Sequence, residues 1–267
     1  MTDPLSLSVR RFGAVYWLGF WTLYLREVRR FLKVFMQTVV APVVTTLLFL
    51  AVFMLAFGGH RHEIGGTPYL EFLAPGLIMM AMVQNAFANT TSSLMIAKVQ
   101  GSIVDVLMPP LSPLELTCGL ALGGVTRGLL VGIAVISAMA FVVPIHIPHP
   151  EPVLFHAFAA SLLLSVLGII GGIWAEKYDH IAAVTNFVVT PLSFLSGTFY
   201  SIANLPPLWH RIALANPFFY MIDGFRYGFI GQAEGSLAVG VVMMVALDLA
   251  LIMLCHQLIA RGYKLKA

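Results

Sequence analysis

One stretch of the sequence, Phe35–Phe57, is predominantly apolar and contains no charged side chain. As a helix rising about 1.5 Å per residue, it is long enough to cross the roughly 30 Å hydrocarbon core of a bilayer. A single crossing segment must be helical, because lipid offers no hydrogen-bond partners to its backbone. Further stretches of this kind follow along the chain, so the sequence predicts an all-α integral membrane protein.

The composition excludes a soluble globular protein. Hydrophobic residues make up 59% of the 267 residues and charged residues only 10%, and the mean hydropathy is +0.91. An average soluble domain has about 25% charged residues. Intrinsic disorder is excluded as well, because it requires a chain poor in apolar residues. About six spans of roughly 20 residues with short loops fill this length, which leaves no room for a nucleotide-hydrolysing domain.

Six transmembrane helices are predicted from the apolar stretches. They cover Phe35–Phe57, Phe72–Ala97, Thr117–Val143, Val153–Trp174, Ile181–Tyr200 and Leu237–Ile259.

The basic residues predict the orientation of these spans. Both ends of the chain are basic: the cluster before the first span and the C-terminal tail comprise Arg10, Arg11, Arg26, Arg29, Arg30, Lys33, Arg261, Lys264 and Lys266. If the N-terminus is cytoplasmic, the inner segments carry eleven Lys and Arg residues and the outer loops carry three. Cytoplasmic loops are enriched in these residues. We therefore expect both termini in the cytoplasm and an even number of spans.

The segment 15–33 predicts an amphipathic helix at the cytoplasmic interface. Its aromatic and apolar residues fall on one face at helical spacing, and Arg26, Arg29, Arg30 and Lys33 fall on the opposite face. Such a helix is expected to lie in the interface with its arginines toward lipid phosphates or a partner protein. Anchoring to the membrane alone is the alternative role.

The segment before the last span is unusually apolar for a loop. Residues 201–234 are rich in aromatic side chains but are interrupted by Pro206, Pro207 and Pro217 and by the charges Arg211, Asp223 and Arg226. These interruptions argue against a continuous span, and short helices that dip into the outer leaflet fit best. The breaks are expected at Leu205-Pro206 and Asn216-Pro217.

Two charges interrupt predicted spans. By helical rise, Arg127 lies roughly 15 Å beyond the start of its span at Thr117, and Asp248 roughly 16 Å beyond Leu237. Both depths are near the bilayer midplane, where a lone charge is costly, so both side chains should face protein or water. Our hypothesis is that they pair or face one polar interior, within or between protomers. Two separately satisfied charges are the alternative.

Polar side chains in the second and fifth spans are candidates to line a substrate path. Together with two aromatic residues that follow the fifth span, they are Asn85, Asn89, Thr90, Ser93, Thr185, Asn186, Thr190, Ser193, Phe199 and Tyr200. Hydrogen bonding between helices is the alternative role for them.

No motif of catalysis or cofactor binding was found. The sequence lacks a nucleotide-binding G-x-x-x-x-G-K-[ST] and the hydrolase and metalloprotease motifs. His60, His62, His146, His149 and His210 are spread over three outer loops without metal-ligand spacing. Cys118 and Cys255 lie in apolar segments, as small buried side chains do. We expect no catalytic residue, no metal site and no cofactor bound by this chain.

The inner loop 98–116 completes the set of features. It reads KVQGSIVDVLMPPLSPLEL, a short amphipathic segment followed by a proline turn. This loop, the segment 15–33, YLEFLAPGLIMM at 69–80 and the block at 191–231 resemble the type-2 ATP-binding-cassette (ABC-2) exporter permeases. The resemblance extends over almost the whole chain and is nearest to the YadH-like and nodulation-factor export branches of that family.

The resemblance implies a single transmembrane domain, 1–267, with an interface helix at 15–33, a docking loop at 98–116 and a re-entrant hairpin at 201–234. It implies two permease copies, here expected to form a homodimer, and two copies of a cytoplasmic ATPase subunit that binds ATP and Mg. The residues expected to contact that ATPase are Gln100, Gly101, Ser102, Ile103, Val104, Asp105, Arg26, Arg29 and Arg30. The family usually has a charged residue near the position of Gly101, so this chain departs from its pattern there.

The function expected from these features is export of an amphiphile across the bacterial inner membrane. The substrate classes left open are a lipid-linked saccharide, a polysaccharide, a lipid or a drug. Membrane lipid is an expected partner, and nucleic acid is not. An ion-coupled secondary transporter is the alternative, but it predicts an inverted repeat and paired intramembrane carboxylates, which the sequence lacks. A membrane-embedded enzyme predicts clustered histidines or carboxylates, and the outer histidines are scattered.

Overall fold

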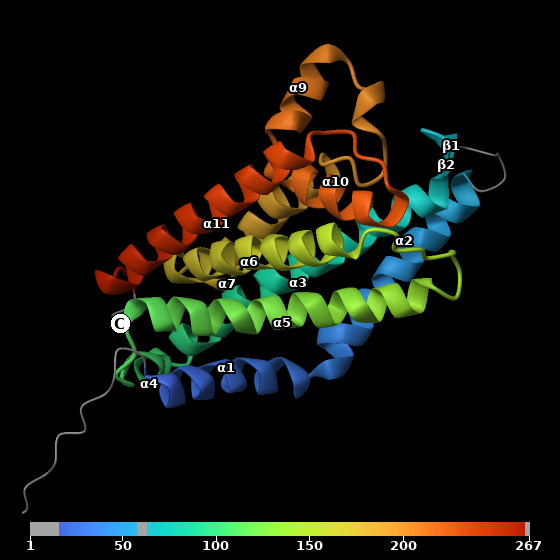
Figure 1. The fold of residues 1–267 in the computed structure, drawn as a ribbon. Helices are drawn as coiled ribbons and strands as arrows, with labels where there is room; N and C mark the ends of the chain where they lie inside the picture. The colour runs from blue at the N-terminus through green and yellow to red at the C-terminus, as the bar shows by residue number, and fades with distance from the viewer. Residues whose placement is uncertain (1–15, 58–62, 265–267) are drawn as a thin grey trace, which may run out of the picture.

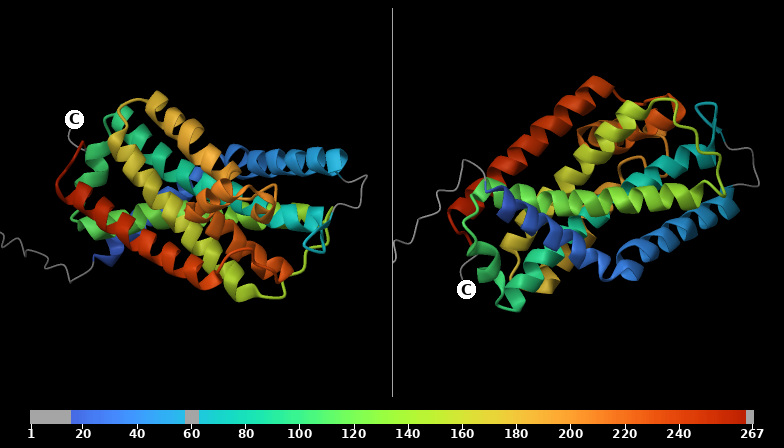
Figure 2. Two further views of the ribbon diagram at one scale, coloured as in Figure 1. Left: turned by 90° about the horizontal axis from the view of Figure 1, so that it is seen from above. Right: turned by 60° about the horizontal axis from the view of Figure 1, so that its bottom comes forward.

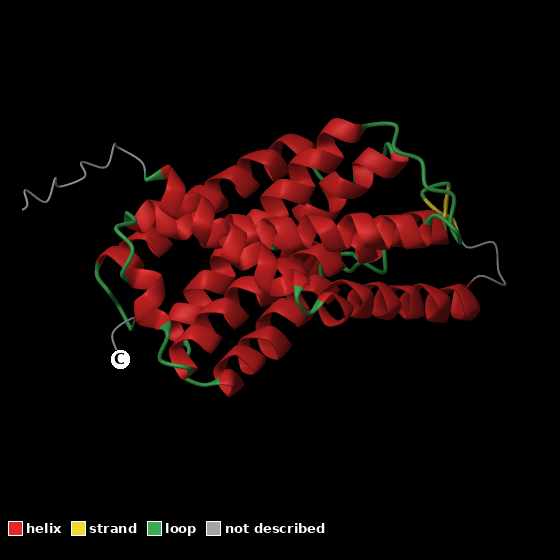
Figure 3. Ribbon diagram, turned by 90° about the horizontal axis from the view of Figure 1, so that it is seen from below, coloured by secondary structure: helices red, strands yellow, loops and turns green. Residues whose placement is uncertain are grey.

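The computed structural model describes residues 16–57 and 63–264. In this part of the chain nearly every element is a helix, and a two-stranded hairpin is the only sheet (Figures 1 and 3). Arg10, Arg11, His60, His62 and Lys266 lie outside the described residues.

Five helices are long and apolar enough to cross a membrane within the described residues. They are the helical run η1–α2 (η1 Met36–Val40, α2 Ala41–Phe57), α3 (Tyr69–Val99), α5 (Pro113–Met139), α6 (Pro150–Trp174) and α11 (Leu237–Ala260). They correspond to the first four and the last of the six predicted spans. The chain is thus a multi-pass helical membrane protein.

The fifth predicted span differs from the other five. In place of one long helix over Ile181–Tyr200, the structure has α7 (Tyr178–Val184), the π-helical η2 (Thr185–Val189) and α8 (Thr190–Phe194), followed by turns. Pro191 has no N–H to donate, which interrupts regular α-helical bonding near this point. The helical run starts earlier and ends earlier than predicted.

Helices α3, α5 and α6 form the centre of the molecule. Helix α3 packs most extensively against α6 and α5, and its residues Leu73, Ile78, Met79 and Ala86 are fully buried. Glycines allow these backbones to approach closely. A Cβ on Gly168 of α6 would lie 2.7 Å from the Phe87 carbonyl oxygen of α3. Helix α3 is therefore the central helix of the bundle, and it fixes the position of the side chains along its length.

The first helix, α1 (Trp17–Leu32), packs against α5 near the α4 end of the molecule (Figure 1). Its buried residues are Leu23, Glu27 and Phe31, spaced one turn apart, whereas Trp17 and Trp21 are more than half exposed. Helices α1 and α2 meet at an angle (Figure 2). The face that packs inward is thus offset from the aromatic face that the sequence predicted.

Short elements precede α3 and follow α8; those after α8 form the region that the sequence predicts on the outer side, and we call it the outer region. The strands β1 (Glu63–Ile64) and β2 (Thr67–Pro68) pair antiparallel before α3. After α8 come the 3₁₀ turn η3 (Ile202–Asn204), α9 (Pro207–Ala215) and α10 (Pro217–Ile230). Asn216 caps α10 by accepting a hydrogen bond from the Phe218 N–H. Helices α9 and α10 thus begin at or just after the two breaks that the sequence predicted, Leu205-Pro206 and Asn216-Pro217.

A fully buried arginine connects this outer region to α3. Arg226 of α10 donates hydrogen bonds to the carbonyl oxygens of Phe72 at 3.1 Å and Gly197 at 2.8 Å. Its guanidinium also lies 3.7 Å from the centre of the Phe72 ring, a cation–π distance. Asp223 accepts hydrogen bonds from the backbone N–H groups of Glu234 and Gly235. These contacts fix α10 against α3 and against the chain that leads into α11.

Candidate transport groove and docking face

The docking segment predicted from the sequence forms a short helix, α4 (Ile103–Leu107). Gly101 has a φ of +70°, a conformation that glycine adopts readily, and it separates α4 from the end of α3. Ile103 and Val106 are buried against the chain, whereas Val104 is 51% exposed and Asp105 is exposed. Val104 and Asp105 are therefore the α4 side chains that a partner could reach.

The end of α3 that carries α4 is fixed to α6. The Lys98 ammonium donates to the carbonyl oxygens of Ile173 at 2.5 Å and Ala175 at 3.0 Å, at the C-terminal end of α6. A cation is favourable there because the last carbonyls of a helix have no partners within it. Movement of α4 would thus be transmitted to α3 and α6 together.

A cavity of about 300 Å³ lies between α1 and α4. Leu18, Thr22 and Arg26 line it from α1, and Asp105 and Val106 line it from α4. Arg26 and Arg29 are both exposed. Two of the three arginines assigned to the ATPase contact are thus available on this side of the protein.

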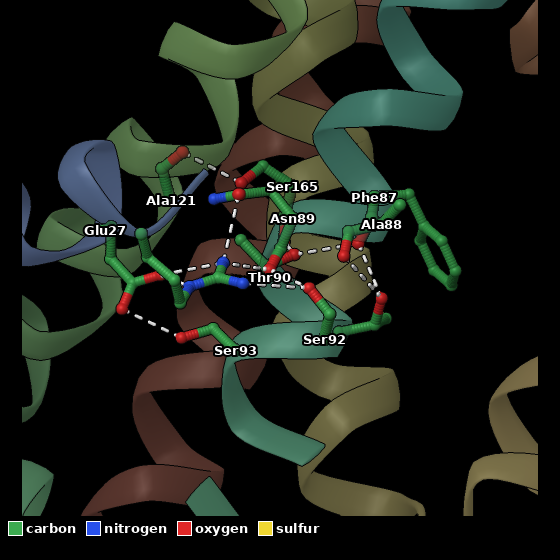
Figure 4. Close-up of polar contacts among 11 residues, drawn as sticks. Glu27, Phe87, Ala88, Asn89, Thr90, Ser92, Ser93, Ala121 and Ser165 are labelled. Atoms are coloured by element: carbon green, nitrogen blue, oxygen red, sulfur yellow. Dashed lines mark hydrogen bonds and ion pairs between the residues drawn. The ribbon is translucent and has the colours of Figure 1, made fainter. Parts of the chain in front are cut away.

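The third, Arg30, points into the protein instead. It forms an ion pair with Glu27, with Nη2 3.1 Å from Oε2, and it donates to Ser92 Oγ at 3.1 Å and to the Asn89 carbonyl at 2.7 Å. Glu27 is fully buried and also accepts from Ser93 Oγ at 2.8 Å. Figure 4 shows Glu27 of α1 among these side chains of α3. The helical-wheel placement of Arg30 on an outward basic face was wrong, because Glu27 and the polar turn of α3 draw it inward.

Two cavities along α3 meet at Gln84 and Asn85. One, about 310 Å³, lies toward α2 and is also lined by Gln37, Thr45 and Thr46. The other, about 410 Å³, lies toward α7 and η2 and is also lined by Ser92, Tyr178 and Thr185. We call the two cavities together the α3 groove. Its polar walls at the level of membrane-spanning helices are suited to a substrate with a polar part.

The structure divides the ten predicted path residues. Asn85 and Thr185 line the groove. Asn89, Thr90 and Ser93 are buried and make contacts between helices, such as the bond from Thr90 Oγ1 to the Ser165 carbonyl at 2.8 Å. Asn186 is exposed, Thr190 is partly buried and the buried Ser193 donates to the Val189 carbonyl within its own helical run.

The two aromatic residues in the predicted path lie farther out. Phe199 stacks on Phe53 and Phe194. Tyr200 lines an apolar cavity of about 770 Å³ beside α9, with Trp209 and Ile212.

The sequence did not single out the groove residues of the first span. Gln37, Thr45 and Thr46 line the groove, but they belong to a stretch that is otherwise largely apolar, and such residues commonly bond within their own helix. Thr46 does so, donating to the Pro42 carbonyl at 2.7 Å. On a helical wheel Gln37 and Thr46 lie roughly 180° apart, so periodicity gave no signal for a shared face. Glu27 was also missed, although its spacing from Arg30 permits an ion pair.

The two intramembrane charges do not pair within the protomer. Arg127 donates from Nη2 to Asn85 Oδ1 at 2.8 Å, and its Nε is buried without an acceptor among the described residues. Asp248 is 7% exposed, and its Oδ1 has no donor in the described part of the chain. The ion pair expected within one protomer is therefore absent, and Arg127 sits instead behind the groove residue Asn85.

Comparison with known proteins identifies the family. Residues 19–230 match the family described as ABC-2 type transporter. The chain is also 37% identical over 253 residues to the "Inner membrane transport permease YadH" of Escherichia coli K12, covering 95% of this chain and 99% of the relative. This chain belongs to the ABC-2 type transporter family.

A second relative is more distant. "Nodulation protein J" of Rhizobium leguminosarum bv. viciae is 24% identical over 236 residues, covering 86% of this chain and 89% of the relative. The family predicted from the sequence is thereby confirmed, as is the inner-membrane, multi-pass character of the protein.

The ABC-2 match places the features above in a family of transport permeases. It runs from α1 through α10 and so includes α4, the groove and Arg127. Helix α11, which carries Asp248, follows the matched region. ABC-2 permeases lack an ATPase of their own and normally pair with an ATP-binding subunit.

Proposed function

We propose that this protein is the permease subunit of an ATP-driven exporter that moves an amphiphilic substrate across the bacterial inner membrane. A separate cytoplasmic subunit binds ATP and Mg and hydrolyses the nucleotide. The observation that carries the proposal is the exposed pair Val104 and Asp105 on α4. Helix α4 follows the end of α3, and α3 lines the groove. A partner that moves α4 would act on the groove through a single rigid helix.

The contacts around α3 support this coupling. Lys98 ties the α4 end of α3 to α6, and the Glu27–Arg30 pair ties α1 to the next turns of α3. A partner seated between α1 and α4 would thus contact two elements that are both fixed to α3. Rigid-body switching between two states needs such packed connections.

A second copy of the permease would cover the groove. Polar residues such as Gln84 and Asn85 are unfavourable against lipid hydrocarbon, so the groove requires protein or water on its open side. The neighbouring surface of α2 and η2 is apolar: Val44, Leu48, Val52 and Phe187 are each at least half exposed. Two copies facing each other across these helices would enclose a shared path for the substrate.

The run from α7 to α8 is proposed as the sixth crossing. At about 1.5 Å per residue, residues 178–194 extend roughly 25 Å, and the turns that follow lead to the outer apolar cavity. Six crossings place both termini in the cytoplasm, in agreement with the basic residues at both ends. Helices α9 and α10 then form a re-entrant hairpin in the outer leaflet.

The docking assignment is tested by co-purification. Tagged permease is extracted from its own bacterium in mild detergent, and the retained ATP-binding subunit is identified and quantified by mass spectrometry. Val104→Glu and Asp105→Arg change exposed side chains, so both variants should fold and each should retain at least about tenfold less ATPase. Native mass spectrometry of the unmodified complex should count two permeases and two ATPases.

Ile147→Glu provides the matched control. Ile147 is 42% exposed in the loop between α5 and α6 at the opposite end of α5 from α4, so this variant should retain the ATPase as the unmodified permease does. If both α4 variants also retain it fully, α4 is not the docking helix. If no ATP-binding protein is retained by any form, the proposed mode of energy coupling is wrong.

A further inference from the structure

The charges behind the α3 groove are unbalanced. None of the described side chains that line its two cavities is charged. Two arginines nevertheless reach this wall from behind: Arg127 donates to Asn85, and Arg30 donates to Ser92. Asn85 and Ser92 both line the groove. The groove is therefore polar at its surface and has cations one hydrogen bond away.

Only one of these two cations has a carboxylate partner in the described part of the chain. Arg30 is paired with Glu27. Arg127 forms no ion pair with a described residue. The layer that contains Glu27, Arg30 and Arg127 thus carries one excess positive charge. In a region with little water, such a charge attracts anions and repels cations strongly.

Arg127 also has unused hydrogen-bonding capacity. A guanidinium has five N–H donors, and the bond to Asn85 is the only one that Arg127 makes to a described residue. It lines neither cavity of the groove, and its Nε is buried without an acceptor among the described residues, so its charge reaches the groove through Asn85. Arginine binds carboxylate and phosphate oxygens with paired, charge-assisted hydrogen bonds.

We propose that the α3 groove selects an amphiphile whose polar head carries an oxyanion, such as a phosphate ester, and that Arg127, one hydrogen bond behind the groove residue Asn85, supplies the positive charge that selects this group. The inference rests on the proposed transport function and narrows its substrate. Amphiphiles with a cationic head, which include many drugs, are disfavoured at this site. The polar groove residues Gln84, Asn85 and Thr185 would contact the rest of the head group.

Binding of three amphiphiles with the same twelve-carbon tail tests this selection. Purified full-length permease in phosphatidylcholine nanodiscs is incubated with radiolabelled dodecyl phosphate. Unlabelled dodecyl phosphate, dodecyl maltoside and dodecyltrimethylammonium then compete for the site. The phosphate should compete at least about tenfold better than the other two, as expected for charge-assisted hydrogen bonds. Equal competition, or a preference for the cation, would overturn the inference.

Variants assign the site to Arg127. Arg127→Gln should weaken dodecyl phosphate binding about tenfold or more, whereas Arg127→Lys keeps the charge and should retain most of the binding. Arg211→Gln removes a positive charge from the exposed surface of α9 and should leave binding unchanged. Should Arg127→Gln precipitate, the Lys variant and the head-group series still decide the result. Unchanged binding in a folded Arg127→Gln variant would contradict the assignment.

Two further comparisons complete the experiment. One identifies the source of the oxyanion, and the other distinguishes failure of this inference from failure of the proposed function. If phosphatidylglycerol added to the nanodiscs displaces dodecyl phosphate, the oxyanion is that of a bilayer lipid. If it does not, the site takes a distinct amphiphile, and both results support oxyanion binding. Because the assay needs no ATPase, loss of head-group selectivity refutes this inference alone, whereas failure of co-purification refutes the proposed coupling alone.

Discussion

Buried charge is handled differently at different residues of this protein. Glu27 and Arg226 are both fully buried and fully engaged, the first by Arg30 and Ser93 and the second by carbonyl oxygens of two segments. Arg127 lacks a carboxylate partner among the described residues. Since satisfied charges are commonly structural and an unsatisfied one is available to a ligand, the first two are expected to control stability and the third to control binding.

Removing the anion of the buried pair should destabilise the junction of α1 and α3. Glu27→Gln leaves Arg30 without its carboxylate partner and should lower the free energy of unfolding by about 1–3 kcal/mol, measured by SDS titration of the permease in mixed micelles. Adding Arg30→Gln should recover part of this loss. Arg29→Gln, on the exposed side of α1, should change stability by less than about 0.5 kcal/mol. An equal loss from the Arg29 variant would refute the special role of the pair.

The arginine that connects α10 to α3 should be among the most sensitive residues. Arg226→Met leaves the buried carbonyls of Phe72 and Gly197 without their donor and should cost about 3 kcal/mol in the same titration. Arg211→Met, at an exposed position of α9, should have little effect. A stable Arg226→Met variant would show that the outer region is held by packing alone.

An exposed ion pair connects the end of the described chain to the residue after the C-cap of α6 and predicts a pH dependence. Lys264 Nζ lies 2.7 Å from Glu176 Oε1, which lowers the pKa of the Glu176 carboxyl below its ordinary 4.5 and raises the pKa of the Lys264 ammonium above 10.5. A lowered carboxyl pKa stabilises the folded state above pH 4.5, and this contribution is lost as pH falls through the lowered value. The raised lysine pKa stabilises it below pH 10.5, and this contribution is lost as pH rises through the raised value.

Hydrogen exchange of the backbone near Lys264 measures this contact. Protection should be constant between pH 5 and 9, after correction for intrinsic exchange, and should fall as the pH drops below the ordinary carboxyl pKa of 4.5. Glu176→Gln should remove the acid-dependent change. A constant low protection across the whole range would mean that the contact does not persist in solution.

At the scale of the elements, periodicity and charge predicted which segments are helical and where most of them lie. The five long spans, the short α4 and the proline breaks around α9 were all visible in the sequence. The π-helical start of the first span and the shortened α7–α8 run were not, because their backbone geometry depends on packing. The inward rotation of α1 was missed because it depends on Glu27 meeting polar groups of α3, a long-range contact that a helical wheel does not contain.

Close helix packing in the core gives a prediction with a control on the same helix. Gly168→Ala on α6 would place a Cβ 2.7 Å from the Phe87 carbonyl oxygen and closer still to Thr90 Oγ1. Separating α3 and α6 should cost about 1–3 kcal/mol. At Gly171 the nearest atom to a new Cβ is 3.8 Å away, so Gly171→Ala should be neutral or stabilising by up to about 1 kcal/mol. Equal effects would contradict the close approach of the two helices.

At the scale of the whole molecule, the protein is a bundle around α3 with the short helix α4 at one end and an open polar groove along its side. The sequence predicted the membrane class, the family and the short helix α4, because composition and local motifs carry them. It predicted only part of the groove, since Gln37 comes from η1 and Thr45 from α2, and they meet Asn85 of α3 only in the folded protein. Arg127 was recognised as exceptional, but its neighbour Asn85 could be identified only from the structure.

The central claim is that ATP on a separate subunit, and not an ion gradient, drives movement around this groove. A spin label at Leu48→Cys, an exposed position of α2 (61%), reports the distance between two permease copies by pulsed electron resonance. Cys118→Ala removes the partly exposed native thiol, and Cys255 is fully buried. In liposomes containing the permease and its ATPase, a non-hydrolysable ATP analogue should shift the distance distribution, and permease alone should show no shift. A distance distribution that is unchanged by the nucleotide analogue but is shifted by a proton or sodium gradient would contradict the account.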